Sequence, residues 1–122
     1  MLLKRTLLVN GVATALTGLL ALLGAPWLPA VLGPTSPRLL AVIGIGLLGF
    51  AAVLLVQARR PRIAPRVAWA IAVMDIAWVL GSLAVVEVGV LTTLGNLIVA
   101  AVAAVVLVFA ILEVRGIAAL AA

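Results

Sequence analysis

The stretch that decides the fold is residues 59–82, which read RRPRIAPRVAWAIAVMDIAWVLGS. Its first eight residues include four arginines, and the rest is apolar apart from one acid, Asp75, and a terminal serine. Short loops rich in Lys and Arg stay on the cytoplasmic side of a membrane. An ionisable group inside a hydrophobic segment is costly and indicates a candidate functional site. The stretch therefore predicts both an orientation in the membrane and a candidate functional site at Asp75.

The composition is that of an integral membrane protein. Of 122 residues, 68% are hydrophobic and only 9% are charged, so a water-soluble domain could not cover its own surface. The chain contains no Cys, His or Tyr, which removes thiol chemistry and the usual ligands of haem and zinc. We expect a single domain over residues 1–122, with no cofactor and no metal site.

Working outward from the basic segment, the chain divides into four apolar spans. We expect them at residues 6–24, 39–57, 67–86 and 91–112, with a basic cytoplasmic loop at 58–66 and a short tail at 116–122. Each span has about the 20 residues needed to cross a core of roughly 30 Å. Four prolines between residues 26 and 37 interrupt any helix there. Short connections predict an all-α, integral membrane four-helix bundle in up-down-up-down order.

The charges predict which way the bundle faces. Seven of the eight basic residues lie on the side of the termini and the central loop, so both termini should be cytoplasmic. Four arginines of the loop should contact anionic lipid headgroups: Arg59, Arg60, Arg62 and Arg66. The net charge of +5 does not indicate nucleic-acid binding, because these residues border membrane spans. Richness in Ala, Val, Leu and Arg with a single Lys suggests a GC-rich bacterial genome, and hence the bacterial cytoplasmic (inner) membrane.

Polar side chains in the first and third spans should face one another. Asn10 and Thr14 share one face of the first span, and Asp75 shares a seven-residue stripe with Ser82 in the third. A rise of ~1.5 Å per residue places Thr14 and Asp75 at the same depth, roughly 13 Å from the inner side. Trp78, one turn further out, would be a wall or gate. These five residues form the candidate polar site.

Two interpretations of Asp75 remain open. As a functional group it would bind a proton or cation beside Thr14 and Asn10. As a structural group it would be protonated or hydrogen-bonded across a helix interface. Interhelical hydrogen bonds contribute only ~0.6 kcal/mol on average, whereas a charged side chain at the membrane centre costs ~2.5–3.5 kcal/mol. Interhelical hydrogen bonds alone do not offset that cost, although protonation of the Asp75 carboxylate removes much of it.

The other two acids are expected at different depths. Glu87 lies at the outer end of the third span, and Glu113 lies at the inner exit of the fourth, where we expect it to pair with Arg115 or Arg59. No converging carboxylates then remain for a metal site or for general acid–base catalysis. The sequence therefore predicts that the protein is not an enzyme.

Small residues predict close contact between helices. The motif GIGLLG at 44–49 lies inside a span, so it indicates close helix approach and not a dinucleotide site. Abundant Ala, Gly and Val with only two Phe predict tight packing and little room for a large ligand.

Two classes of function fit these observations. We prefer a non-enzymatic accessory or oligomer-forming membrane module that associates with itself or with other membrane helices. The alternative is a proton- or cation-coupled small-solute carrier or channel that uses Asp75. No broken helix or opposed repeat of the kind seen in many transporters is visible.

Overall fold

The computed structural model describes residues 2–120, which form five α-helices and no β-strand. The elements are α1 (Leu2–Leu23), α2 (Leu28–Leu32), α3 (Pro37–Arg59), α4 (Pro65–Val88) and α5 (Thr93–Leu120). Each helix except the short α2 is long and apolar enough to cross a membrane. The predicted all-α four-helix bundle is confirmed, and the chain is a small multi-pass membrane protein.

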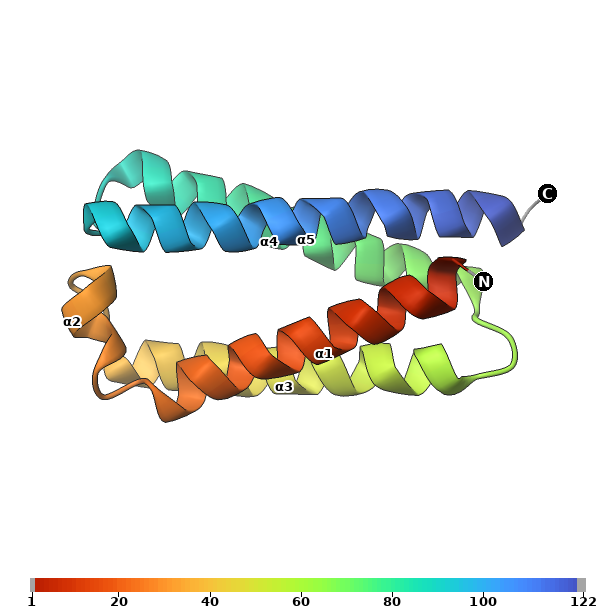
Figure 1. Cartoon of the computed structure of the whole chain (residues 1–122), viewed down its shortest axis with the longest axis horizontal. Helices are drawn as coiled ribbons and strands as arrows, with labels where there is room; N and C mark the ends of the chain where they lie inside the picture. Colours follow the sequence, from red (N-terminus) through yellow and green to blue (C-terminus); the bar gives the residue numbers. More distant parts are fainter. Residues whose placement is uncertain (1, 121–122) are drawn as a thin grey trace.

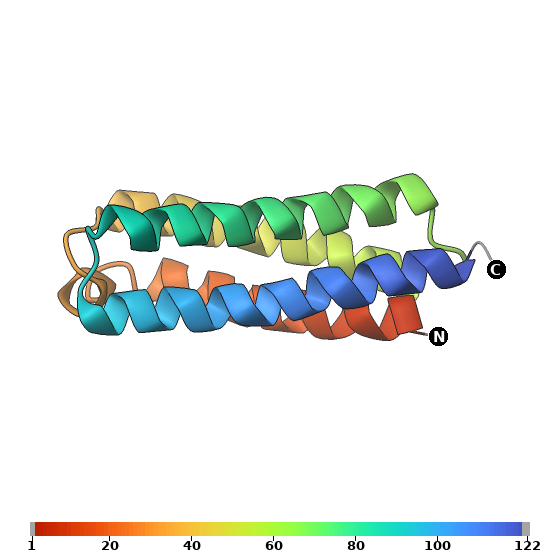
Figure 2. The same ribbon diagram turned by 90° about the horizontal axis from the view of Figure 1, so that it is seen from above.

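The four long helices form two antiparallel pairs that lie in two layers. In Figure 1, α1 and α3 make the lower layer and α4 and α5 the upper one. Within each layer the two helices pack along their length, and the layers meet mainly where α1 contacts α5. Figure 2 shows α4 lying over α3 and α5 over α1. The N-terminal end of α1, the C-terminal end of α5 and the basic loop share one end of the bundle, which we call the inner end.

Local sequence signals set the helix ends. Pro37 and Pro65 stand in the first turns of α3 and α4, where a missing N–H costs nothing. The hydroxyl of Ser36 accepts the Leu39 N–H at 3.3 Å and caps α3. After α4 the chain turns at Gly89, whose φ of 76° is left-handed and favours glycine. These signals keep the connections short, which makes neighbouring helices antiparallel.

Glycine brings α1 and α3 into backbone contact. A Cβ added at Gly44 would lie 2.7 Å from the Gly18 carbonyl oxygen, and one at Gly18 would lie 2.9 Å from the Gly44 oxygen. No side chain fits at that crossing. The close approach expected from residues 44–49 therefore occurs at Gly44, whereas a Cβ at Gly46 or Gly49 would meet nothing within 4 Å.

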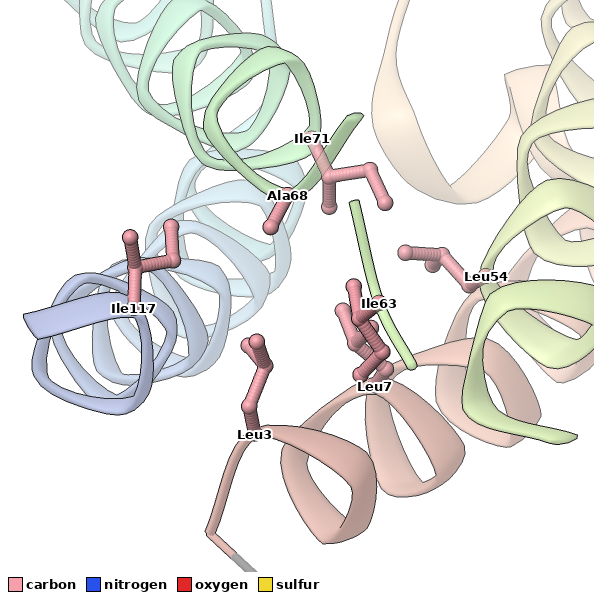
Figure 3. Packing of buried hydrophobic residues seen from close by; sticks show 7 residues of the cluster. All are labelled: Leu3, Leu7, Leu54, Ile63, Ala68, Ile71 and Ile117. Atoms are coloured by element: carbon pink, nitrogen blue, oxygen red, sulfur yellow. The ribbon is translucent and has the colours of Figure 1, made fainter. Parts of the chain in front are cut away.

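An apolar cluster closes the inner end of the bundle. Figure 3 shows its members, which come from all four long helices and the basic loop: Leu3, Leu7, Leu54, Ile63, Ala68, Ile71 and Ile117. Gly116 allows this closure, because a Cβ there would lie 2.8 Å from the Leu3 side chain and 3.0 Å from its Cα. The two layers are thus drawn together at this end.

At the opposite end, α2 is tied to the start of α5. Thr92 donates its hydroxyl proton to the Val31 carbonyl at 2.7 Å and its N–H to the Leu32 carbonyl at 2.8 Å. The same hydroxyl accepts the Gly95 N–H at 2.9 Å, which caps α5. Thr92 thus satisfies backbone carbonyl groups at the C-terminal end of α2 and a backbone N–H group at the N-terminal end of α5.

Candidate functional site

Asn10 joins two acids from two other helices. Its Nδ2 donates one hydrogen bond to Asp75 Oδ2 and another to Glu113 Oε2, each at 2.9 Å. The two acceptor oxygens therefore lie within twice that distance of each other. All three side chains are buried, with exposed fractions of 1% for Asn10, 4% for Asp75 and 0% for Glu113. We call Asn10, Asp75 and Glu113 the polar cluster.

The orientation of the Asn10 amide is fixed from both sides. Thr14, one turn along α1, donates its hydroxyl proton to Asn10 Oδ1 at 2.9 Å. Both amide protons are then directed at the acids, so every polar group of the Asn10 side chain is used. The structure brings Asn10 and Asp75 together, although the depth count places Thr14, one turn further along α1, level with the acid. Thr14 reaches the acid through Asn10, not directly.

The expected position of Glu113 was wrong. It does not lie at the membrane exit beside Arg115 or Arg59 but is fully buried against Asn10. The reason is that α5 continues to Leu120, through residues expected to be a tail. Glu113 thus precedes the end of α5 by seven residues, while Asp75 follows the start of α4 by ten. Because these helices are antiparallel, the two acids reach similar depths.

A sequence signal for Glu113 did exist. Residues 114–120 contain no proline and only one charge, so a helix can continue through them, although Gly116 directly after Arg115 also matches a helix-end signal. The prediction stopped at the first charged residues, Glu113 and Arg115, which is the usual place for a span to end. Only the contact with α1 shows that one of them faces inward.

One oxygen of the cluster has no partner. Glu113 Oε1 is buried and accepts no hydrogen bond from any residue in the range 2–120. The neutral amide of Asn10, and not a Lys or Arg side chain, is the hydrogen-bond donor to both acids. A buried acceptor without a donor costs about 1–3 kcal/mol. The unsatisfied Glu113 oxygen can accept a proton, and the two acids can balance the charge of a monovalent cation.

A half-open cavity of about 570 Å³ lies beside the polar cluster and is lined by all four long helices, with Met74 and Val105 exposed at its edge. Its polar side is formed by Asn10, Thr14, Thr17 and Asp75, and the remaining walls are apolar. The prediction of little room for a large ligand is therefore wrong. Small residues pack α1 closely on α3, but the two layers meet mainly through α1 and α5, which leaves space between them.

The remaining predicted site residues divide between the cavity and its surroundings. Trp78 lines the cavity one turn from Asp75. Ser82 is half-buried and does not belong to the lining. The four predicted headgroup-contacting residues are exposed at the inner end of the bundle: Arg59, Arg60, Arg62 and Arg66. Their contact with lipid headgroups stays a prediction.

Comparison of the chain with models of protein families, with curated proteins and with solved structures finds no match.

Proposed function

We propose that the protein is a small, non-enzymatic membrane carrier in which the polar cluster exchanges a proton for a cation that enters the cavity. The observation that supports this most is the bonding of two acids from different helices to one neutral amide at a cavity wall. The sequence alone favoured an accessory module because one internal acid is the minimum for ion coupling. The structure adds a second internal acid, Glu113, and for this reason we now prefer the carrier to the accessory module.

Helix–helix association alone does not explain why two acids are buried. Each interhelical hydrogen bond contributes ~0.6 kcal/mol on average. Each charged acid in the membrane costs ~2.5–3.5 kcal/mol. A neutral side chain in place of either acid would hold the helices together at less cost. Retaining two carboxyl groups therefore favours a role in which their charge changes.

The exchange follows from charge balance. Two carboxylates on one donor repel each other, so a proton on one of them relieves the repulsion when the cavity is empty. When a cation enters, it supplies the balancing charge and the proton leaves. The titratable groups that meet at the cluster are Asp75 from α4 and Glu113 from α5, while α1 contributes neutral Asn10 and Thr14. The side of the cavity formed by α3 is apolar apart from backbone groups.

Proton exchange can be tested in liposomes that contain the purified protein and a pH-sensitive dye. An inward gradient of a monovalent cation, sodium, potassium or an organic ammonium in separate trials, should make the wild-type liposomes lose internal protons. Asp75→Asn and Glu113→Gln should each reduce the rate at least about tenfold, the effect of a change of roughly 1.4 kcal/mol. Glu87→Gln, an exposed acid on α4, is the matched control and should keep the wild-type rate.

The outcome separates the two classes of function. A wild-type rate equal to that of protein-free liposomes for every cation contradicts the carrier. If, in addition, Asp75→Asn alters only thermal stability or co-purifying membrane proteins, the accessory module replaces it. Folding of each variant is checked by its helical circular dichroism and its elution volume in detergent.

A further inference from the structure

The cavity has two chemically different parts. Asp75 is the ionisable residue of the lining, and it lies with Asn10 and Thr14 on the polar side. Three aromatic rings from three helices belong to the remaining lining: Phe50 of α3, Trp78 of α4 and Phe109 of α5. We propose that the cavity binds a lipophilic monovalent organic cation, with its charge beside Asp75 and its apolar groups against these rings.

The sign of the charge follows from the lining. No Lys or Arg from the range 2–120 contributes to the cavity wall. An anion would meet the Asp75 carboxylate without a compensating cation, and a neutral ligand would leave that carboxylate unpaired. A cation balances it in surroundings of low dielectric constant, where the attraction is stronger than in water.

The size of the cavity and the scarcity of polar groups count against a bare divalent metal ion. Divalent calcium takes six to eight oxygen ligands and magnesium takes six, whereas this cavity offers only four polar side chains. Its volume of about 570 Å³ falls within the roughly 300–1,000 Å³ of sites for drug-sized ligands. Such sites are mostly apolar with a few placed polar groups, which is the pattern seen here.

The aromatic ring nearest Asp75 in sequence is placed to assist. Trp78 follows Asp75 by three residues, so both project from the same face of α4. Trp is the best aromatic partner for a cation, and the attraction grows when both groups are removed from water. A positive centre between the carboxyl and the indole would interact with both.

This inference rests on the proposed function for its physiological meaning, but binding is measured without transport. Radiolabelled tetraphenylphosphonium is dialysed against the purified wild-type protein in detergent, with empty micelles as background. We expect saturable binding at one site per chain. Tetraphenylborate, which has the same shape and the opposite charge, should not compete. If tetraphenylphosphonium binds but no proton moves in liposomes, the proposed ligand class is supported and the proposed carrier function is contradicted.

Two variants with a matched control locate the site. Asp75→Asn should weaken phosphonium binding by about tenfold or more, and Trp78→Leu by about tenfold. Trp69→Leu removes a half-exposed ring from α4 outside the cavity and should change the affinity less than about twofold. Should Asp75→Asn fail to fold, Trp78→Leu against Trp69→Leu decides. Equal affinity for the two tetraphenyl ions, or unchanged affinity in both Asp75→Asn and Trp78→Leu, would overturn the proposal.

Discussion

The two sides of α1 make contact in opposite ways. Toward α3, the backbones touch at Gly18 and Gly44, and no polar side chain is needed. Toward α4 and α5, the Asn10 side chain reaches across beside a cavity and holds two acids. The first interface is specified by shape and the second by hydrogen bonds. The difference teaches that one helix can be fixed by backbone shape on one face and by buried hydrogen bonds on another.

The largest effect should come from breaking the shape-specified interface. In Gly44→Ala the new Cβ meets two backbone atoms, the Gly18 oxygen at 2.7 Å and the Leu22 nitrogen at 2.8 Å. Backbone atoms cannot move aside singly, so we expect a loss of about 3 kcal/mol, at the upper end of overpacking costs. Gly49→Ala on the same helix is the control, since its Cβ meets nothing within 4 Å. Unfolding in SDS followed by circular dichroism measures both, and equal stabilities would contradict the contact.

A smaller loss is expected at the hydrogen-bonded interface. Asn10→Leu removes the donor to two buried acids, and leaving them without it should cost about 2 kcal/mol. The control is Asn96→Leu in α5, where the Oδ1 of Asn96 is buried without a partner in the range 2–120. That substitution should be neutral or stabilising in the same SDS titration. If Asn10→Leu is neutral too, Asn10 does not join the layers.

The smallest effect should come from the outer bond of the network. Thr14→Val deletes the hydroxyl that orients the Asn10 amide, and we expect a loss of ~0.6 kcal/mol. Thr17→Val also alters the cavity lining, but its hydroxyl bonds the Ala13 carbonyl of its own helix at 2.8 Å. Thermal unfolding in detergent should show Thr14→Val melting below Thr17→Val. The reverse order would show that Thr14 does not support the cluster.

Much of the fold could be predicted because it depends on hydropathy and depth. Four apolar stretches of spanning length determine four helices. Counting residues from the basic ends places Thr14 level with Asp75, so it finds the polar face of α1 but misses by one turn the residue that meets the acid, Asn10. The role of Glu113 could not be predicted in the same way. It depends on where α5 ends and on which face of α5 meets α1, and neither property is visible in the average apolarity of a span.

The cavity escaped prediction for a related reason. Composition reports how small the side chains are, but it does not say which helices pair. Gly18 and Gly44 allow one pair to close completely, while the layers remain apart beside Asp75 and Trp78. A chain of small residues therefore contains both a backbone contact and a space of ligand size.

The hydrogen bonds of Asn10 have a mechanical consequence. The bonds that connect α1 to α4 and α5 are the same bonds that position the two acids. A ligand that draws one carboxyl toward itself must weaken a hydrogen bond between the layer of α1 and α3 and the layer of α4 and α5. Under the proposed function, ligand binding would therefore weaken the hydrogen-bonded contact between the two layers, while the apolar cluster at the inner end would still hold them together.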